Sequence, residues 1–350
     1  MGASTTDVLP NLSLAPSFDI LHSALKNLTI APVTWNEDGT GPNPAENDEK
    51  VVNKFLLSVV SNELAWHTEE QRETIHELAS ERISERCGRT AAPEMTRTWM
   101  ITATSSLLEL GFAIKEPRIT EDNLGFKTWG TAYALSKQLE QIGQRCLKYM
   151  VGSLKQDRGS ALAAGMSANP NTRVLELGSG TGLVGIAVAA VWGVDVLLTD
   201  LPNIIDNLQY NVDQNSATVS SNGGSIKCKV LDWKNEEHAA QTIGDQTFEI
   251  VVAADPMYDD DHPLLVANMI AKYLKEEKTS AALVAVPMRD KNTKAMYRDF
   301  VDMMRERDMQ LKDQGGINFM DDWGTAGDEG VECWWSIWGW DVPWVTPALS

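Results

Sequence analysis

The segment Val174–Gly185, "VLELGSGTGLVG", decides the fold. Its apolar beginning predicts a strand, and the second apolar run at its end predicts a helix. Between them lie Gly178, Gly180 and Gly182. Glycine lets the backbone approach a ligand closely, and the start of a helix offers free N–H groups. We therefore expect a strand, a ligand-binding loop and a helix, in that order.

The chain beyond Pro170 repeats this order of strand and helix. Apolar strands are expected at residues 173–177, 195–199, 225–233, 248–254 and 281–287, with helical patterns after most of them. This alternation predicts a parallel sheet that is covered by helices on both faces. The glycine-rich stretch 321–330 and the tryptophan-rich run 331–340 break the rhythm. A closing antiparallel hairpin is expected there.

The N-terminal third has a different pattern. Residues 1–48 are rich in Pro, Asn, Ser and Thr and predict a mostly irregular arm. Apolar spacing then predicts helices at 49–66, at 68–88 with Gly88 as C-cap, and at 95–111, and a fourth follows at 132–150. We therefore divide the chain into a helical accessory region, 1–118, and an α/β domain, 119–350.

Composition excludes several functional classes. The net charge of −19 argues against a nucleic-acid-binding face, which needs clusters of lysine and arginine. No window approaches the ~20 apolar residues that span a bilayer. The four cysteines lack the spacing of a zinc site or a disulfide framework, and the N-terminus has no secretion signal. We expect a cytoplasmic protein.

Charged residues beside the glycine loop indicate its ligand. From Gly180 the loop matches GxGxxG, which suggests a dinucleotide. Glu176 would repel a pyrophosphate but attract an amino-acid ammonium, which favours S-adenosylmethionine. Asp200, at the end of the second strand, can accept hydrogen bonds from ribose hydroxyls. Its alternative role is the N-cap of the following helix.

Two further motifs follow strands of the same predicted sheet. Asp232 and Trp233, in "LDW", can reach an adenine amino group and its ring, although Trp233 can also be a core residue. Asp255 and Tyr258, in "DPMY", end the next strand. Ligands of open α/β sheets bind beyond the carboxyl ends of the strands. All four side chains are therefore candidates for one site.

The acidic run 259–262, "DDDH", and the aromatic run 333–340, "CWWSIWGW", have competing interpretations. The acidic run could bind a metal, start a helix, or form a rim that attracts a basic protein. Four consecutive residues cannot easily all face one ion, so we expect no metal site. The aromatic run could form a substrate cage or pack in the core.

Five motifs in order, "KTWG", "VLELGSGTGLVG", "TDLP", "LDW" and "DPMY", resemble the seven-strand protein lysine methyltransferases of family 16 over residues 123–340. The resemblance implies a Rossmann-like class I methyltransferase fold, S-adenosylmethionine as cofactor, and transfer to a lysine of a protein. The N-terminal segment is similar to the extension of fungal members. Some relatives of that kind act on translation elongation factor 2, which implies such a factor as partner.

The resemblance also implies roles for single residues. Asp255 would bind and orient the lysine amine, and Tyr258 would offer its hydroxyl and ring to the same group. The cofactor would contact Trp129, Glu176, Gly178, Gly180, Gly182, Asp200, Leu201, Asp232, Trp233 and Ala254. Trp129 has an alternative role as a packing residue at a helix start.

Three alternatives remain for the function. A small-molecule N- or O-methyltransferase can use the same fold, because fold does not dictate the acceptor. A catalytically idle protein could bind cofactor and a partner. A dinucleotide-dependent oxidoreductase is the third, and Glu176 argues against it.

Overall fold

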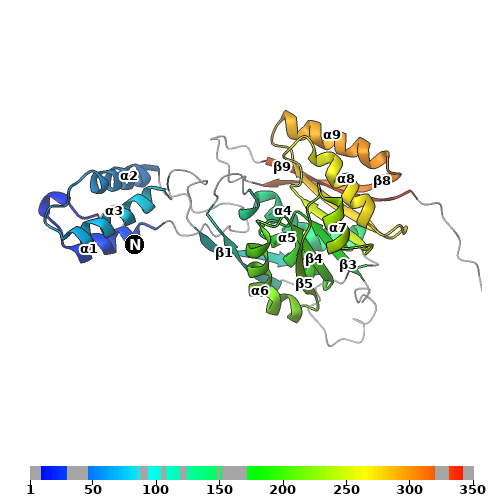
Figure 1. The fold of residues 1–350 in the computed structure, drawn as a ribbon, viewed down its shortest axis with the longest axis horizontal. Helices are drawn as coiled ribbons and strands as arrows, with labels where there is room; N and C mark the ends of the chain where they lie inside the picture. Colours follow the sequence, from blue (N-terminus) through cyan, green and yellow to red (C-terminus); the bar gives the residue numbers. More distant parts are fainter. Residues whose placement is uncertain are drawn as a thin grey trace, which may run out of the picture. The chain divides into compact units, whose positions relative to one another are not determined.

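The computed structural model describes residues 9–29, 46–84, 86, 94–103, 108–118, 124–147, 150–151, 172–319 and 331–341 (Figure 1). Its contacts divide the chain into two compact units, one of residues 1–97 with 117–122 and one of residues 98–116 with 123–350. The domain division at residue 118 stays a prediction. Within the ranges described, no helix is long and apolar enough to cross a membrane.

A seven-stranded sheet forms the centre of the larger unit, in the order β5-β4-β3-β6-β7-β9-β8. Its parallel strands are β3 (Arg173–Leu177), β4 (Asp195–Asp200), β5 (Ser225–Val230), β6 (Ile250–Ala254) and β7 (Ala281–Pro287). The antiparallel pair β8 (Met309–Phe319) and β9 (Val331–Trp340) completes it beside β7. The expected Rossmann-like sheet with a C-terminal hairpin is confirmed.

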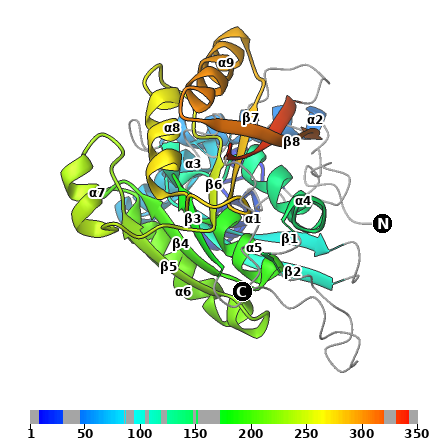
Figure 2. The ribbon, with the colours of Figure 1, turned by 90° about the vertical axis from the view of Figure 1, so that its right-hand side faces the viewer.

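Helices cover both faces of this sheet (Figure 2). One layer contains α4 (Gly130–Cys146), α5 (Leu183–Trp192) and α6 (Ile205–Ser221), and the other contains α7 (Glu236–Thr242), α8 (His262–Tyr273) and α9 (Lys291–Arg305). Every residue of α5 is buried, because α4, α6 and the sheet surround it. The strand order reverses between β3 and β6, which is where such sheets bind ligands.

The helix expected at residues 95–111 is wrong. The structure has a two-stranded sheet of β1 (Met95–Ala103) and β2 (Leu108–Glu116), followed by the short 3-10 helix η4 (Leu124–Phe126). Leu110, Phe112 and Ile114 are buried at alternating positions of β2. That period of two belongs to a strand, and the β-branched residues of β1 also favour one.

Three asparagines of α6 bind the exposed backbone of β2. Asn211 accepts from the Lys115 N–H (2.8 Å) and donates to the Lys115 carbonyl (3.0 Å). One turn later, Asn215 makes the same pair of bonds with Ala113, at 3.0 and 2.8 Å. Asn207 adds a bond to the Lys115 carbonyl (3.1 Å). Side chains four residues apart on a helix thus replace a neighbouring strand.

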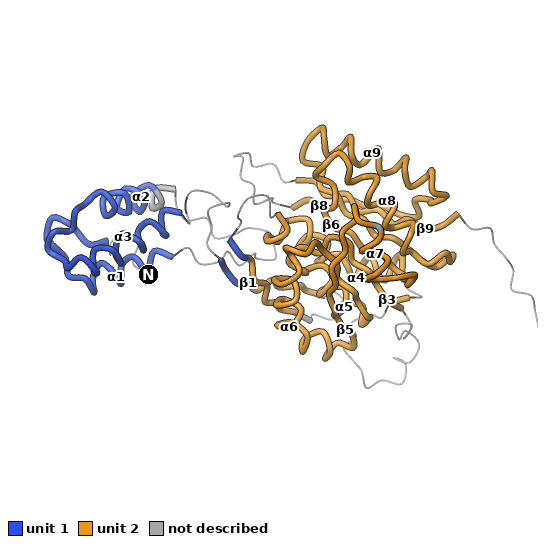
Figure 3. Tube along the Cα trace, in the orientation of Figure 1, with its two compact units in different colours: residues 1–97, 117–122 blue, residues 98–116, 123–350 orange. Residues whose placement is uncertain are grey.

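The smaller unit is built from α1 (Phe18–Asn27), α2 (Glu46–Val60) and α3 (Glu69–Ser84), preceded by the short 3-10 helix η2 (Leu12–Leu14) (Figure 3). The last two helices were expected from the sequence, whereas α1 lies in the supposed irregular arm. Leu21 and Leu25 form one buried face of α1 and join the cluster of α2 and α3. The Gly88 C-cap lies outside the described residues.

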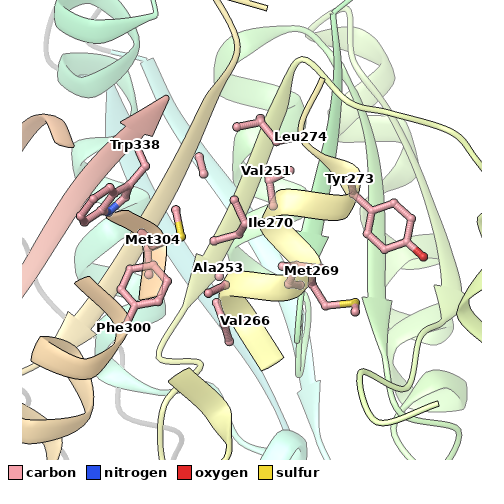
Figure 4. Close-up of a cluster of buried hydrophobic side chains, with 14 of the residues drawn as sticks. Val251, Ala253, Val266, Met269, Ile270, Tyr273, Leu274, Phe300, Met304 and Trp338 are labelled. Atoms are coloured by element: carbon pink, nitrogen blue, oxygen red, sulfur yellow. The ribbon is translucent and has the colours of Figure 1, made fainter. Parts of the chain in front are cut away.

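Aromatic and aliphatic side chains fill the space between the sheet and α8 and α9 (Figure 4). Trp338 of β9 is fully buried against Phe300 of α9, with ring centroids 5.8 Å apart, and its indole donates to Ser336 Oγ. Trp335 is also buried, whereas Trp334 is 39% exposed. Core packing therefore explains Trp335 and Trp338 of the aromatic run.

Candidate functional site

The carboxyl ends of the parallel strands bring the predicted residues to one edge of the sheet. Gly178 follows β3 directly, Asp200 ends β4, and Asp232 is the second residue after β5. Ala254 ends β6, where it pairs with Ala285, and Asp255 follows directly. The site is therefore built around the reversal of strand order between β3 and β6.

The glycine loop has a backbone that other residues adopt only with strain. Gly178, Gly180 and Gly182 have φ of +66°, +55° and +92°, in the left-handed region. A Cβ on Gly182 would lie 2.7 Å from Leu208 Cδ1, and one on Gly180 would lie 3.3 Å from the Gly125 carbonyl oxygen. Because α5 begins at Leu183, the loop leads directly into a helix N-terminus. Such an end is suited to an anionic group.

Glu176 lies inside β3, below the loop, and only 2% of its surface is exposed. Its Oε2 is buried and has no hydrogen-bond partner among the described residues. Burial, with a further contribution from the charge of Asp200, raises the pKa of Glu176 from 4.5 to about 8. A cationic group beside this carboxylate would compensate its negative charge and favour its ionised form.

Asp200 ties the end of β4 to the glycine loop. Its Oδ2 accepts from the Gly180 N–H and its Oδ1 from the Leu201 N–H, both at 2.7 Å. Burial raises the pKa of Asp200. The N-cap alternative is wrong, because α6 begins at Ile205 and Ile204 occupies its cap. Leu201, the other predicted contact, is 40% exposed directly after β4.

Trp233 brings the loop after β5 against the glycine loop. Its six-membered ring lies 3.1 Å from the point where a Cβ of Gly178 would stand. The same ring meets His262 edge-on, with centroids 5.9 Å apart, and also packs against the core cluster. Asp232 accepts the N–H of Lys234 at 2.9 Å and so fixes the turn that carries Trp233. Trp233 thus packs against both the core cluster and the glycine loop, and its contact with an adenine ring stays a prediction.

The segment Asp255–Tyr258 turns sharply after β6. Asp255 has φ of +54°, which is rare for a residue with a side chain, yet its N–H still bonds to the Ala285 carbonyl at 2.8 Å. Met257 is buried in the core, whereas Tyr258 is exposed and its ring stands edge-on to His262 at 4.3 Å. The turn therefore keeps the side chains of Asp255 and Tyr258 out of the core, while Met257 anchors the segment in it.

Sequence reasoning missed two partners of Asp255. Arg289, just beyond β7, donates from Nη1 to Oδ1 (3.2 Å) and from Nη2 to Oδ2 (2.8 Å). Thr131, in the first turn of α4, donates its hydroxyl to Oδ2 (3.2 Å). The signal for Arg289 was its place after the strand next to β6. The Asp255 side chain is only 10% exposed, so the carboxylate is held in place by its neighbours.

Trp129 lies beside this pair, directly before α4. Its indole donates to the Leu124 carbonyl (3.2 Å), and the Arg289 guanidinium carbon lies 5.4 Å from its ring centroid. The preceding Thr128 shares a 2.7 Å hydrogen bond with Thr181 of the glycine loop. Trp129 thus begins a helix and also contacts the site, so its two predicted roles are compatible.

The acidic run begins α8. Asp259, Asp260 and Asp261 are exposed, and Asp261 occupies the cap position before His262 without a capping hydrogen bond from its side chain. In the part of the chain that the structure describes, no group of three or more metal-binding side chains is arranged around a common point. The run lies next to Tyr258 in the sequence and places negative charge beside it.

Comparisons with known proteins match most of the chain. A family model described as lysine methyltransferase matches residues 110–307. The protein-lysine N-methyltransferase rrg1 of Schizosaccharomyces pombe is 31% identical over 285 residues, which are 81% of this chain and 82% of that protein.

Two further relatives match shorter parts of their own length. The protein-lysine N-methyltransferase EFM2 of Saccharomyces cerevisiae is 33% identical over 77% of this chain, which spans 61% of that protein. The EEF1A lysine methyltransferase 3 of Xenopus tropicalis is 35% identical over 37% of this chain and 53% of its own length.

Proposed function

The chain belongs to the lysine methyltransferase family and is an S-adenosylmethionine-dependent protein-lysine N-methyltransferase, and from this premise we propose that its substrate is a translation elongation factor. The name of a relative that methylates a lysine of EEF1A supports this class of substrate. Translation elongation factor 2 is the first candidate, because the N-terminal extension is similar to that of fungal members. A cytoplasmic location, where such factors work, is part of the proposal.

The residues at the sheet edge suit S-adenosylmethionine. The buried Glu176 carboxylate would receive the ammonium of the ligand. Ser179, Gly180 and Gly182 already donate their N–H groups within the protein, so the ligand carboxylate would lie against the remaining N–H groups between the glycine loop and the start of α5. Asp200 and Leu201 would bind the ribose, and Asp232 and Trp233 the adenine. Ala254 and Trp129 would line the path toward the acceptor. When bound, the cofactor supplies a methyl group on a sulfonium, ready for displacement by a nitrogen lone pair.

Asp255 and Tyr258 would hold the lysine on the line of that displacement. The observation that supports this role is the turn after β6, which holds the Asp255 carboxylate beside the glycine-loop edge in a strained backbone conformation. Orientation of the amine lowers the barrier, because the reacting atoms start near attack distance. Lysine has an ordinary pKa of about 10.4, so the site must also favour loss of its proton.

The accessory region 1–118 and the methyltransferase domain 119–350 complete the proposal. The helices of the accessory region would supply a second contact with a large protein substrate. The exposed acidic run after Tyr258 would attract the basic surroundings of the target lysine.

Transfer of labelled methyl groups to purified elongation factors tests the proposal. We expect acid-precipitable label on elongation factor 2, or on elongation factor 1A as the second arm, with mass spectrometry showing a methylated lysine. Asp255→Asn should reduce transfer at least about 100-fold while cofactor binding persists. Asp245→Asn, an exposed carboxylate between α7 and β6 that lies outside the acidic run, is the matched control and should stay active.

Two results would contradict the proposal. Label that enters another cytosolic protein, with neither factor modified, would remove the elongation-factor assignment. Full activity of Asp255→Asn would remove the role of that carboxylate and leave the substrate assignment intact.

A further inference from the structure

The Asp255 carboxylate is already half of an ion pair. Arg289 binds it through two nitrogens, at 2.8 and 3.2 Å, and the Arg289 side chain is 27% exposed. Trp129 covers the guanidinium, and Thr131 adds a third donor from α4. Planar two-point pairing of this kind fixes the orientation of both groups. The acceptor site therefore carries a fixed positive charge beside its carboxylate.

This charge bears on a requirement of the reaction. A lysine ammonium has no lone pair and cannot accept a methyl group. A solitary carboxylate would attract the ammonium and hold its proton in place, since an opposite charge nearby favours the charged form. A carboxylate paired with a guanidinium can still orient an amine by hydrogen bonding, but it no longer favours a second cation beside it.

We propose that Arg289 is a positioning residue of the acceptor site, where its charge, joined to Asp255, makes the site bind the lysine as a neutral amine. The inference rests on the proposed role of Asp255. The ammonium releases its proton to solvent as it enters. The new N–C bond then forms from the freed lone pair, and the electron pair of the broken C–S bond stays on sulfur, as in the established reaction.

Other titratable groups around the site come from several elements: Lys127, Glu176, Asp200, Tyr258, Asp259, His262 and Cys333. Burial lowers the pKa of His262 and raises the pKa of Cys333, and partial desolvation raises the pKa of Tyr258. The pKa of about 8 for Glu176 belongs to the ligand-free protein, and at saturating cofactor this carboxylate is equally present and equally paired in every Arg289 variant. Differences between those variants therefore isolate the charge at position 289.

The first test measures methylation rates from pH 6.5 to 9.5 for wild type, Arg289→Gln and Arg289→Lys at saturating cofactor. We expect Arg289→Gln to lose about 10-fold in kcat at pH 7.5, to keep or lower its KM for the acceptor, and to regain activity at high pH. The acid limb of its pH–rate profile should move to higher pH by about one unit or more. Arg289→Lys keeps the charge, so its limb should stay near that of wild type. Arg298→Gln on the exposed face of α9 is the control.

A second test counts protons without relying on turnover. Calorimetry of acceptor binding at pH 8.5, with S-adenosylhomocysteine present and in two buffers of different ionisation enthalpy, reports the protons released. S-adenosylhomocysteine has no sulfonium charge, so loss of the lysine proton on binding reflects the charges of the enzyme and not that of the cofactor. We expect wild type to release more protons per acceptor than Arg289→Gln, which should bind the acceptor at least as tightly.

An equal loss of kcat at every pH, with unchanged proton release, would show that Arg289 only supports the fold and would overturn the inference. If neither elongation factor accepts label, the pH profiles are measured with total cytosolic protein as acceptor. The substrate assignment would then fail while the role of Arg289 is still decided. If Asp255→Asn is fully active, and if Arg289→Gln does not shift the acid limb of its pH–rate profile, neither residue belongs to the acceptor site.

Discussion

Glu176→Gln should stabilise the ligand-free protein and weaken S-adenosylmethionine at the same time. Glu176 is almost fully buried, and burial, followed by the charge of Asp200, raises its pKa from 4.5 to about 8. The unfolded chain loses this proton near pH 4.5, whereas the folded protein keeps it up to about pH 8. A neutral amide of the same shape avoids the burial of a charge.

The sign and size of the effect follow from proton linkage. Between pH 4.5 and about 8 the unfolded state binds fewer protons than the folded state, so the free energy of unfolding of wild type falls as the pH rises. Below 4.5 the effect vanishes, and above about 8 it is complete. A shift of about 3.5 units corresponds to about 5 kcal/mol, and at pH 7 to about 3 kcal/mol, on the order of what one buried charge costs.

The ligand reverses this destabilisation. In the proposed site its ammonium would pair with ionised Glu176, so binding below pH 8 would release a proton and the affinity of wild type should rise with pH. Above about pH 8 the ligand's own amino group loses its proton, which gives the affinity a maximum. Glu176→Gln cannot offer the charge, and its affinity should be about 10- to 100-fold lower with a weaker dependence on pH.

Urea denaturation of ligand-free wild type, Glu176→Gln and Glu237→Gln from pH 5 to 9 checks the stability, and calorimetry with S-adenosylmethionine checks the affinity. Glu237 lies exposed on α7, and its substitution should leave the pH dependence of wild type unchanged. The gain of Glu176→Gln over wild type should grow from small at pH 5 to about 3 kcal/mol at pH 7. The reasoning would be refuted if the free energy of unfolding had the same pH dependence in wild type and Glu176→Gln, or if both proteins bound the cofactor with equal affinity.

Two further predictions concern the loop and its support. Gly182→Ala and Gly223→Ala both place a side chain at a left-handed φ, +92° and +87°, and each should lose about 1–2 kcal/mol of stability. A Cβ at Gly182 would also lie 2.7 Å from Leu208, whereas nothing lies within 4 Å at Gly223, so Gly182→Ala should lose about 1–3 kcal/mol more and bind cofactor weakly. Equal losses in thermal denaturation would show that the contact with Leu208 relaxes freely. Asn211→Leu removes side-chain bonds to the backbone of β2 and of the glycine loop and should cost about 2–4 kcal/mol, with faster amide exchange in β2. Gln214→Leu, on the exposed face of the same helix, is the control, and identical exchange in the two variants would contradict the role of Asn211.

The two-stranded sheet of β1 and β2 shows where sequence reasoning stopped. Apolar residues in 95–111 fit a helical spacing as well as an alternating one, and a short run cannot be assigned by periodicity alone. The partner that decides between them is the asparagine face of α6, about a hundred residues further along the chain. No local feature of 95–111 reveals that partner.

Sequence reasoning could predict Glu176, the glycine loop and the acidic motifs at the ends of β4, β5 and β6, because each belongs to a strand end that is visible in the sequence. Parallel strands bring their carboxyl ends to one edge, so knowledge of the strands was enough to group these residues. Their contacts with ligand and substrate stay predictions.

By itself, the sequence determined the alternating α/β sheet, the glycine loop and the family, because strand periodicity and glycine requirements are local properties. Only the tertiary structure decided that Arg289 and Thr131 hold Asp255. They lie 34 and 124 residues away from it in the chain, and they meet it because β7 pairs with β6 and α4 begins over the same edge. Contacts of this kind depend on the order of strands and the packing of a helix, which the global burial of apolar surface selects.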